Sequence, residues 1–98
     1  MEKLTPHYLL SDVKSLIQDG KVRSTISALA GGAALGFDLD GILGVIKALT
    51  SANFYKSMTT HSDHRVWQDV YRSTTSAGEV YVKLTVVGDV LIVSFKEL

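Results

Sequence analysis

The chain has 98 residues, of which 46% are apolar, and a mean hydropathy of +0.19. This length suits one domain with one core, residues 1–98, and the composition favours a folded globule over a disordered chain. The absence of cysteine excludes disulfides and thiolate metal sites. We find neither a bilayer-spanning apolar run nor a signal peptide, so we expect a cytoplasmic protein without membrane contact. Ten Lys and Arg balance ten Asp and Glu, so any surface that binds nucleic acid must arise from local arrangement.

The first half of the chain has the period of amphipathic helices. Thr5-Pro6 suits the cap and first turn of a helix, and Gly20 suits its left-handed C-terminal cap. A second, weaker helix can be capped by Ser24 or Thr25, and Gly31-Gly32 must fray or end it because glycine costs about 1 kcal/mol in a helix interior. The apolar residues of these two helices are Leu9, Leu10, Val13, Leu16, Ile17, Ile26, Leu29 and Ala30.

A third helix begins at Asp38 or Asp40, carboxylates that favour a helix N-terminus, and turns Leu39, Ile42, Leu43, Ile46 and Leu49 inward. From Asn53 onward the apolar period changes to two, which predicts strands over 54–58, 66–72, 79–87 and 89–96. A polar hairpin loop spans 73–78, and Gly88-Asp89 suits a two-residue hairpin with glycine first. The sequence therefore predicts an α+β fold with three N-terminal helices packed on a C-terminal antiparallel sheet.

Alternation along these strands separates an apolar face from a polar one. In the strand 79–87, Val80, Val82, Leu84 and Val86 must meet the helices, whereas Tyr81, Lys83 and Thr85 face the other way. In the strand 66–72, Gln68 and Arg72 share one side, and Lys56 shares a side with Phe54 and Met58. If these strands are neighbours, one sheet face would collect Lys56, Gln68, Arg72 and Tyr81.

Such a set suits RNA cleavage without a metal, in which the ribose 2′-hydroxyl attacks the adjacent phosphate. The reaction needs a proton acceptor, a proton donor, and cations around the phosphorane. Lys56 and Arg72 provide charge, Gln68 a polar contact, and Tyr81 one exchangeable proton. For Lys56 or Tyr81 to act as base near neutrality, its pKa must fall by roughly three units from about 10. The assignment of acid and base stays open.

Three aromatic residues, Tyr55, Tyr71 and Trp67, could stack on unpaired bases. Each of these residues has a simpler role to weigh. Trp67 and Phe95 suit core or edge packing, Lys83 and Lys96 suit protection of sheet edges, and an isolated polar residue on a strand is usually only solvated.

The motif His61-Ser62-Asp63-His64 combines two imidazoles with a carboxylate, and His7 could be a distant third ligand or a third site residue. A zinc site needs four ligands, and no cysteine or further nearby ligand completes the set. A polar loop is the favoured interpretation, and no phosphate-binding glycine loop is present. We therefore expect neither a metal nor a cofactor.

Longer motifs resemble one family of small bacterial toxins. The matching motifs include Thr5-Pro6-His7, residues 54–60 (Phe-Tyr-Lys-Ser-Met-Thr-Thr), Ser62-Asp63-His64, residues 67–72 (Trp-Gln-Asp-Val-Tyr-Arg) and residues 89–97. With these motifs the chain resembles the motility quorum-sensing regulator (MqsR) toxins along nearly its whole length.

The resemblance implies a RelE-like fold and the toxin of a type II toxin–antitoxin system, a sequence-selective endoribonuclease that cuts single-stranded mRNA at GCU-type sites. It also implies a zinc-containing, DNA-binding antitoxin that links the toxin indirectly to operator DNA, and roles in growth arrest, persistence and biofilm formation. The implied catalytic residues are Lys56, Gln68 and Tyr81, and the implied substrate contacts are Tyr55, Met58, Arg72 and Lys96. Two alternatives remain: a weakly catalytic or non-catalytic module that acts by binding its antitoxin, and a plain structural domain.

Overall fold

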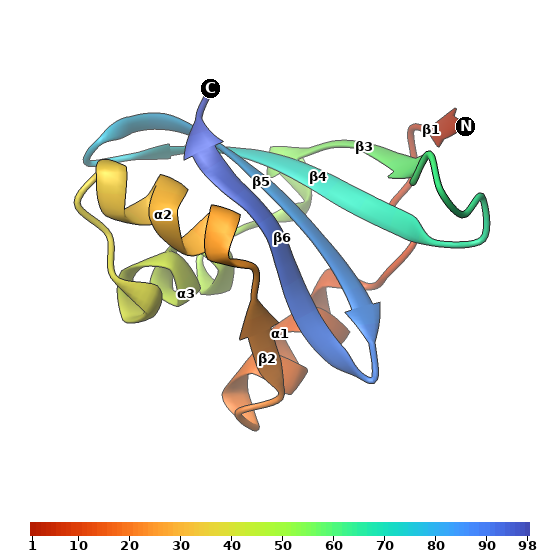
Figure 1. Cartoon of the computed structure of the whole chain (residues 1–98), viewed down its shortest axis with the longest axis horizontal. Coiled ribbons are helices and arrows are strands. Elements are labelled where there is room, and N and C mark those ends of the chain that lie inside the picture. Colours follow the sequence, from red (N-terminus) through yellow and green to blue (C-terminus); the bar gives the residue numbers. More distant parts are fainter.

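The computed structural model describes residues 1–98 throughout and contains three α-helices and one six-stranded sheet (Figure 1). The helices are α1 (Leu10–Gln18), α2 (Ile26–Ala34) and α3 (Leu39–Lys47), with a short 3-10 turn at Ser51–Asn53. The strands are β1 (Glu2–Lys3), β2 (Val22–Ser24), β3 (Phe54–Thr59), β4 (Trp67–Thr75), β5 (Gly78–Val87) and β6 (Asp89–Glu97). The predicted α+β class and all three helices are confirmed.

The sheet has the order β1-β3-β4-β5-β6-β2, and β2 runs parallel to β6. The predicted C-terminal antiparallel sheet is confirmed in β3 to β6, whereas two short N-terminal strands that were not predicted form its edges. Strands of two and three residues are too short to show a period in the sequence. The predicted polar loop 73–78 is also too long, since β4 ends at Thr75 and β5 begins at Gly78. The predicted turn at Gly88 is present, with Gly88 at φ +73, but Val87 pairs with Asp89 and Val86 with Val90, so the expected two-residue loop Gly88-Asp89 is not formed.

Helix α1 begins at Leu10 and not at Thr5-Pro6. The backbone N–H groups just before the helix are already engaged, because the Asp69 carboxylate accepts hydrogen bonds from His7 at 3.1 Å and from Tyr8 at 2.9 Å. The Asp69 carboxylate of β4 thus holds the backbone at residues 7 and 8 against the sheet, and the helix begins only at Leu10. After the helix, Gly20 has φ +76, the left-handed conformation expected of it.

Helix α2 continues through Gly31-Gly32 to Ala34, so the expectation that these glycines fray or end it is wrong. A Cβ at Gly31 would lie 1.9 Å from the carbonyl oxygen of Phe95, and a Cβ at Gly32 would lie 2.4 Å from Cδ1 of Ile42. The glycines allow close packing of α2 on β6 and α3. Thr25 caps α2 and Asp38 caps α3: their side chains accept hydrogen bonds from the backbone N–H groups of Ala28 and Gly41. The alternative caps Ser24 and Asp40 are not used.

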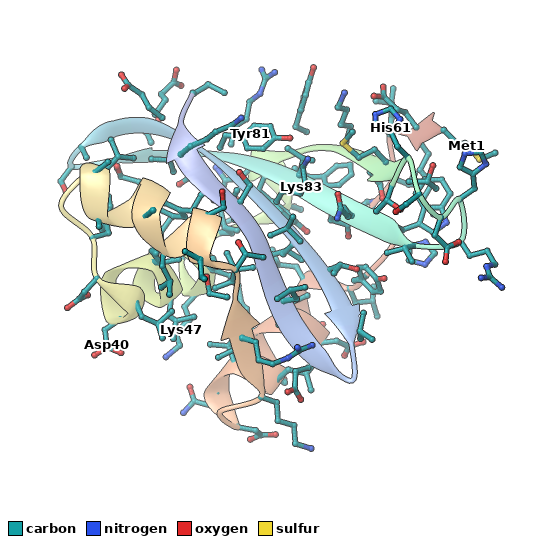
Figure 2. All side chains as sticks on the ribbon, in the orientation of Figure 1. Met1, Asp40, Lys47, His61, Tyr81 and Lys83 are labelled. Carbon is teal, nitrogen blue, oxygen red and sulfur yellow. The ribbon has the colours of Figure 1, made fainter.

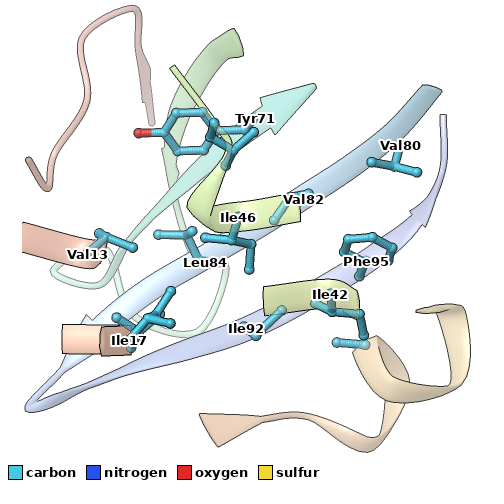
Figure 3. Packing of buried hydrophobic residues seen from close by; sticks show 13 residues of the cluster. Val13, Ile17, Ile42, Ile46, Tyr71, Val80, Val82, Leu84, Ile92 and Phe95 are labelled. Carbon is cyan, nitrogen blue, oxygen red and sulfur yellow. The ribbon is translucent and has the colours of Figure 1, made fainter. Parts of the chain in front are cut away.

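All three helices pack on one face of the sheet and enclose one hydrophobic core (Figure 3). Predicted core positions confirmed as buried include Val13, Ile17, Ile42, Ile46, Leu49, Val80, Val82 and Leu84. No single helix is long and apolar enough to cross a membrane; α2 and α3, bent by 89°, meet that test of length and composition only as a pair. The opposite face of the sheet, here called the open face, carries none of the three helices (Figure 1).

Candidate active site on the open face of the sheet

The strand register places the predicted catalytic side chains on the open face. Opposite residues in an antiparallel ladder point to the same side of a sheet. One row across β3, β4 and β5 pairs Lys56 with Val70 and Val70 with Lys83, and the next row pairs Arg72 with Tyr81. The row of Arg72 and Tyr81 continues to Lys96 in β6, and a third row pairs Met58 with Gln68. The convergence of Lys56, Gln68, Arg72 and Tyr81 on one face, which alternation predicted, is confirmed.

Cations and tyrosine rings are interleaved across this face. The guanidinium carbon of Arg72 lies 3.6 Å from the ring centre of Tyr55, and Nζ of Lys56 lies 5.4 Å from the same ring. Around Tyr81, Nζ of Lys96 lies at 5.1 Å and Nζ of Lys83 at 5.8 Å from the ring centre. Such contacts orient cations and rings toward each other. Four cationic side chains thereby gather on one face of a chain with no net charge.

An irregularity in β3 helps to assemble this surface. The register between β3 and β4 shifts between Phe54 and Lys56, as in a β-bulge. A bulge changes the direction of neighbouring side chains. Phe54 packs inward with its ring 5.5 Å from that of Tyr71, whereas Tyr55 and Lys56 both reach the open face. Two successive residues of one strand can therefore serve the same site.

The open face has a hydrophobic floor beneath its charged side chains. Val70 is fully buried but lies outside the cluster that packs under the helices. It stands in the ladder between Lys56 and Lys83, so the two lysine side chains flank an apolar residue. Lysine stems commonly cover such apolar surface while the ammonium remains in water. Figure 2 shows Tyr81 and Lys83 on the side of the molecule away from Asp40 and Lys47 of α3.

Lys56 forms an ion pair that its sequence neighbourhood does not suggest. Its Nζ lies 2.6 Å from the carboxylate of Glu2 in β1. The hydrogen bond to Glu2 raises the pKa of Lys56, with further favourable contributions from the charges of Glu2, Tyr55 and Tyr81 that oppose desolvation. The same hydrogen bond, together with the charge of Lys56, lowers the pKa of Glu2. Lys56 is therefore an ammonium at neutral pH, which is the opposite of what a lysine base would need.

Two of the three predicted stacking residues do not lie on the open face. Tyr71 is 1% exposed in the core, and burial raises its pKa to about 12. Trp67 lies one residue from Gln68 and so points to the other side of β4; its ring stacks on His7 at 5.3 Å, with Nζ of Lys3 4.2 Å from its centre. Neither ring is available to a base there. Tyr55, which is 40% exposed, is the predicted stacking residue that the face retains.

The structural roles predicted for Phe95 and Lys83 have different outcomes. Phe95 is buried in the core, as its packing interpretation predicted. Edge protection is wrong for Lys83, because β5 lies between β4 and β6. Lys83 is one of the cations on the open face. It lies two residues from Tyr81 in β5, and this spacing in the sequence predicts that both side chains lie on the same side of the sheet. Thr85, expected beside Lys83 on that face, is buried, and its hydroxyl donates to the Trp67 carbonyl at 2.7 Å.

The His61–His64 segment forms a polar loop, and His7 stacks on Trp67 instead of joining it. Nowhere in residues 1–98 do three His, Cys, Asp or Glu side chains gather in a way that could hold a metal ion. Asp63 accepts hydrogen bonds from the backbone and side chain of Arg65, and these bonds lower the pKa of Asp63. The carboxylate of the motif is therefore already engaged.

Two comparisons place the chain among known proteins. The family model described as "Motility quorum-sensing regulator, toxin of MqsA" matches residues 5–97. The "mRNA interferase toxin MqsR" of Escherichia coli (strain K12) is 59% identical over 97 residues, which covers 99% of this chain and 99% of that protein. The matched residues include all three helices and the strands that form the open face. The chain belongs to the motility quorum-sensing regulator toxin family.

Proposed function

We propose that this chain is an mRNA interferase, an endoribonuclease that cuts single-stranded mRNA at GCU-type sites without a metal and so arrests translation and growth. The observation that carries the proposal is the open face itself, where Lys56, Gln68 and Tyr81 lie among further cations. The name of the Escherichia coli relative supports the same activity.

The reaction is an internal transesterification. The ribose 2′-oxygen forms a bond to phosphorus, the bond from phosphorus to the 5′-oxygen breaks, and the products are a 2′,3′-cyclic phosphate and a 5′-hydroxyl. The proton of the 2′-hydroxyl passes to a base, and the departing 5′-oxygen receives a proton from an acid. Negative charge on the phosphorane oxygens is greatest in the transition state, where fixed cations contribute most.

We assign the acid and electrostatic role to Lys56. Its pKa is raised by the Glu2 hydrogen bond, so at neutral pH it can donate a proton and stabilise negative charge but has no free lone pair. Tyr81 is then the candidate proton acceptor: its phenolate would take the proton of the 2′-hydroxyl, and two ammonium groups flank its ring. Gln68, opposite Met58 in the ladder, would hold the scissile nucleotide through its neutral amide.

The remaining predicted contacts fit a bound single strand. Arg72 and Lys96 supply charge for phosphates on the Tyr81 side of the face, and Met58 supplies a flexible apolar surface. Tyr55 would stack on a base with the part of its ring that Arg72 leaves uncovered. A strand crossing the sheet would then meet cations and aromatic rings in alternation, which is the usual design for single-stranded nucleic acid.

We further propose that the fold is RelE-like, that residues 1–98 act as one domain in the cytoplasm, and that a zinc-containing, DNA-binding antitoxin neutralises the toxin and connects it to operator DNA. The family description, which names a toxin of MqsA, supports an antitoxin partner. The alternative function is a module without catalytic activity that acts only by binding its antitoxin, and the zero net charge of the chain is the reason to consider it. The four cations around Tyr55 and Tyr81 provide local positive charge for RNA, so the zero net charge is a weaker argument against catalysis.

Cleavage of a defined RNA in excess EDTA tests the proposed function. The substrate is a single-stranded RNA with one GCU triplet, and its controls carry a scrambled triplet or a single 2′-deoxy substitution at the scissile ribose. The protein should cut only the first RNA and leave a cyclic phosphate. Cleavage that needs a divalent metal, or that survives the 2′-deoxy substitution, would refute the mechanism. Unimpaired growth on expression without the antitoxin would instead favour the binding module.

A further inference from the structure

A small pocket adjoins the open face at the end of β3. It encloses about 230 Å³ and is lined by Met1, Glu2, Met58, Thr59, Thr60, His61 and His64. Figure 2 shows His61 and Met1 together at the end of the molecule that carries β1. The mechanism proposed above gives no role to most of these residues.

The pocket is continuous with the proposed catalytic residues. Glu2 lines it and also holds Nζ of Lys56 at 2.6 Å. Met58 lines it and lies opposite Gln68 in the ladder. A nucleotide whose phosphate meets Lys56 would therefore place a neighbouring base within reach of the pocket. The position suits recognition of a base beside the scissile bond.

Among the polar groups of the pocket, the two imidazoles are the free ones. The Thr59 hydroxyl accepts a hydrogen bond from the N-terminal ammonium at 3.1 Å, and the Thr60 hydroxyl donates to the Asp63 carbonyl at 2.8 Å. No hydrogen bond joins His61 or His64 to another residue, and both side chains are exposed. A neutral imidazole offers one donor and one acceptor on a planar ring.

The charges around the pocket favour a base over a phosphate. The carboxylate of Glu2 opposes an anion, and the N-terminal ammonium is engaged by Thr59. The other charged groups in the loop, Asp63 and Arg65, pair with each other at 3.1 Å. A neutral ring with exocyclic donors and acceptors matches what is left: two imidazoles and the adaptable side chain of Met58.

We infer that this pocket binds one nucleobase next to the cleaved phosphodiester and that His61 and His64 determine which base is accepted there. This inference rests on the proposed ribonuclease function. It assigns discrimination between RNA sequences to the loop after β3 and leaves bond cleavage to the open face.

Substrate discrimination tests the assignment. The ratio of kcat/KM between a preferred RNA and RNAs changed at one flanking base is compared for the wild type, the double variant His61→Ala/His64→Ala and the loop control Ser62→Ala, which does not line the pocket. The double variant should lose discrimination about tenfold at one flanking position, and Ser62→Ala should keep it. Unchanged discrimination at every position in the double variant would overturn the assignment.

A binding measurement separates this inference from the proposed function. An oligonucleotide with a 2′-deoxy scissile ribose is titrated into the wild-type protein, and the ring signals of His61 and His64 are followed by NMR. The signals should move with an oligonucleotide and stay in place with an abasic analogue of the same length. If wild-type protein cuts no RNA but the signals respond to the base, only the ribonuclease proposal fails. If cleavage occurs and neither ring responds, the pocket proposal fails.

Discussion

Glu2 and Lys56 are 54 residues apart in the sequence, yet their side chains form a 2.6 Å ion pair on the open face. A substrate phosphate that reaches Lys56 would meet this carboxylate at the same ammonium. A bound phosphate must therefore displace Glu2 or share the ammonium with it. Glu2 both fixes the position of Lys56 and competes with the substrate for its charge.

Replacing Glu2 by Gln should strengthen RNA binding. The amide is nearly the same size but carries no charge, so Lys56 meets the phosphate without competition. Because exposed ion pairs are weak, KM should fall only about two- to fivefold. Steady-state cleavage at several salt concentrations measures it, with Asp40→Asn as the control on an exposed carboxylate of α3, away from the open face. A higher KM would show that Glu2 mainly positions Lys56.

The same variant tests the electrostatics through pH. Glu2 has a lowered pKa, so its stabilising contribution is present above its ordinary value of 4.5 and is lost as pH falls through the lowered value. Lys56 has a raised pKa, so its contribution is complete below 10.5 and is lost as pH rises through the raised value. An NMR titration of the Lys56 side chain should give a lower pKa in Glu2→Gln than in the wild type. Equal values would show that the ion pair does not form in solution.

Removing the charge of Lys83 should weaken RNA binding without changing sequence preference. Lys83 lies on the open face across Val70 from Lys56. In Lys83→Ala, the slope of log K against log salt should become shallower by about 0.7, the value for one phosphate contact on a single strand. Binding of an uncleavable oligonucleotide measures the slope, and Lys47→Ala on α3 serves as the control. An unchanged slope would remove Lys83 from the interface.

Loss of the Asp69 carboxylate should release the N-terminal segment. This fully buried side chain accepts the backbone N–H groups of His7 and Tyr8. Leaving those donors unpaired should cost about 1–3 kcal/mol in Asp69→Ala. Urea unfolding measures the loss, and Asp19→Ala, at the exposed C-terminal end of α1, should stay close to the wild type. If Asp69→Ala proves equally stable, the segment must be held by other contacts.

Gly31 and Gly44 should respond in opposite directions to alanine. Alanine favours a helix by about 1 kcal/mol relative to glycine. At Gly44 nothing lies within 4 Å of the added Cβ, so stability should rise; at Gly31 the Cβ would meet the Phe95 carbonyl oxygen at 1.9 Å. Gly31→Ala should therefore lose about 1–3 kcal/mol through displacement of α2. Calorimetry of both variants shows whether packing or helix propensity has the larger effect on stability. A stabilised Gly31→Ala would contradict the close approach of Gly31 to the Phe95 carbonyl oxygen.

Much of the open face could be predicted because strand alternation has a period of two. Lys56, Gln68, Arg72 and Tyr81 were located by that rule, and the register confirms their shared side. The same rule places Trp67 and Tyr71, which directly adjoin Gln68 and Arg72, on the opposite side of the sheet. Their aromatic character suggested base stacking, but in the folded chain Trp67 stacks on His7 and Tyr71 is buried in the core.

Other features have no local pattern from which to predict them. The ion pair of Glu2 with Lys56 depends on β1, which is two residues long, and the start of α1 depends on a carboxylate from β4. The continuation of α2 through Gly31 depends on how closely β6 approaches it. Each of these outcomes is decided by a contact between distant parts of the chain, which intrinsic propensity does not encode.

Single-turnover cleavage by Lys56→Ala, beside wild type and Lys47→Ala, tests most directly whether the open face performs the chemistry. Both variants remove one lysine charge, but Lys47 lies on α3, on the side of the molecule away from the open face (Figure 2). Lys56→Ala should cut a GCU-containing RNA about 10²- to 10⁴-fold more slowly, as expected for loss of a proton donor, while its thermal unfolding stays near that of wild type. Lys47→Ala should cleave at the wild-type rate. Wild-type cleavage by folded Lys56→Ala would contradict an active site on this face.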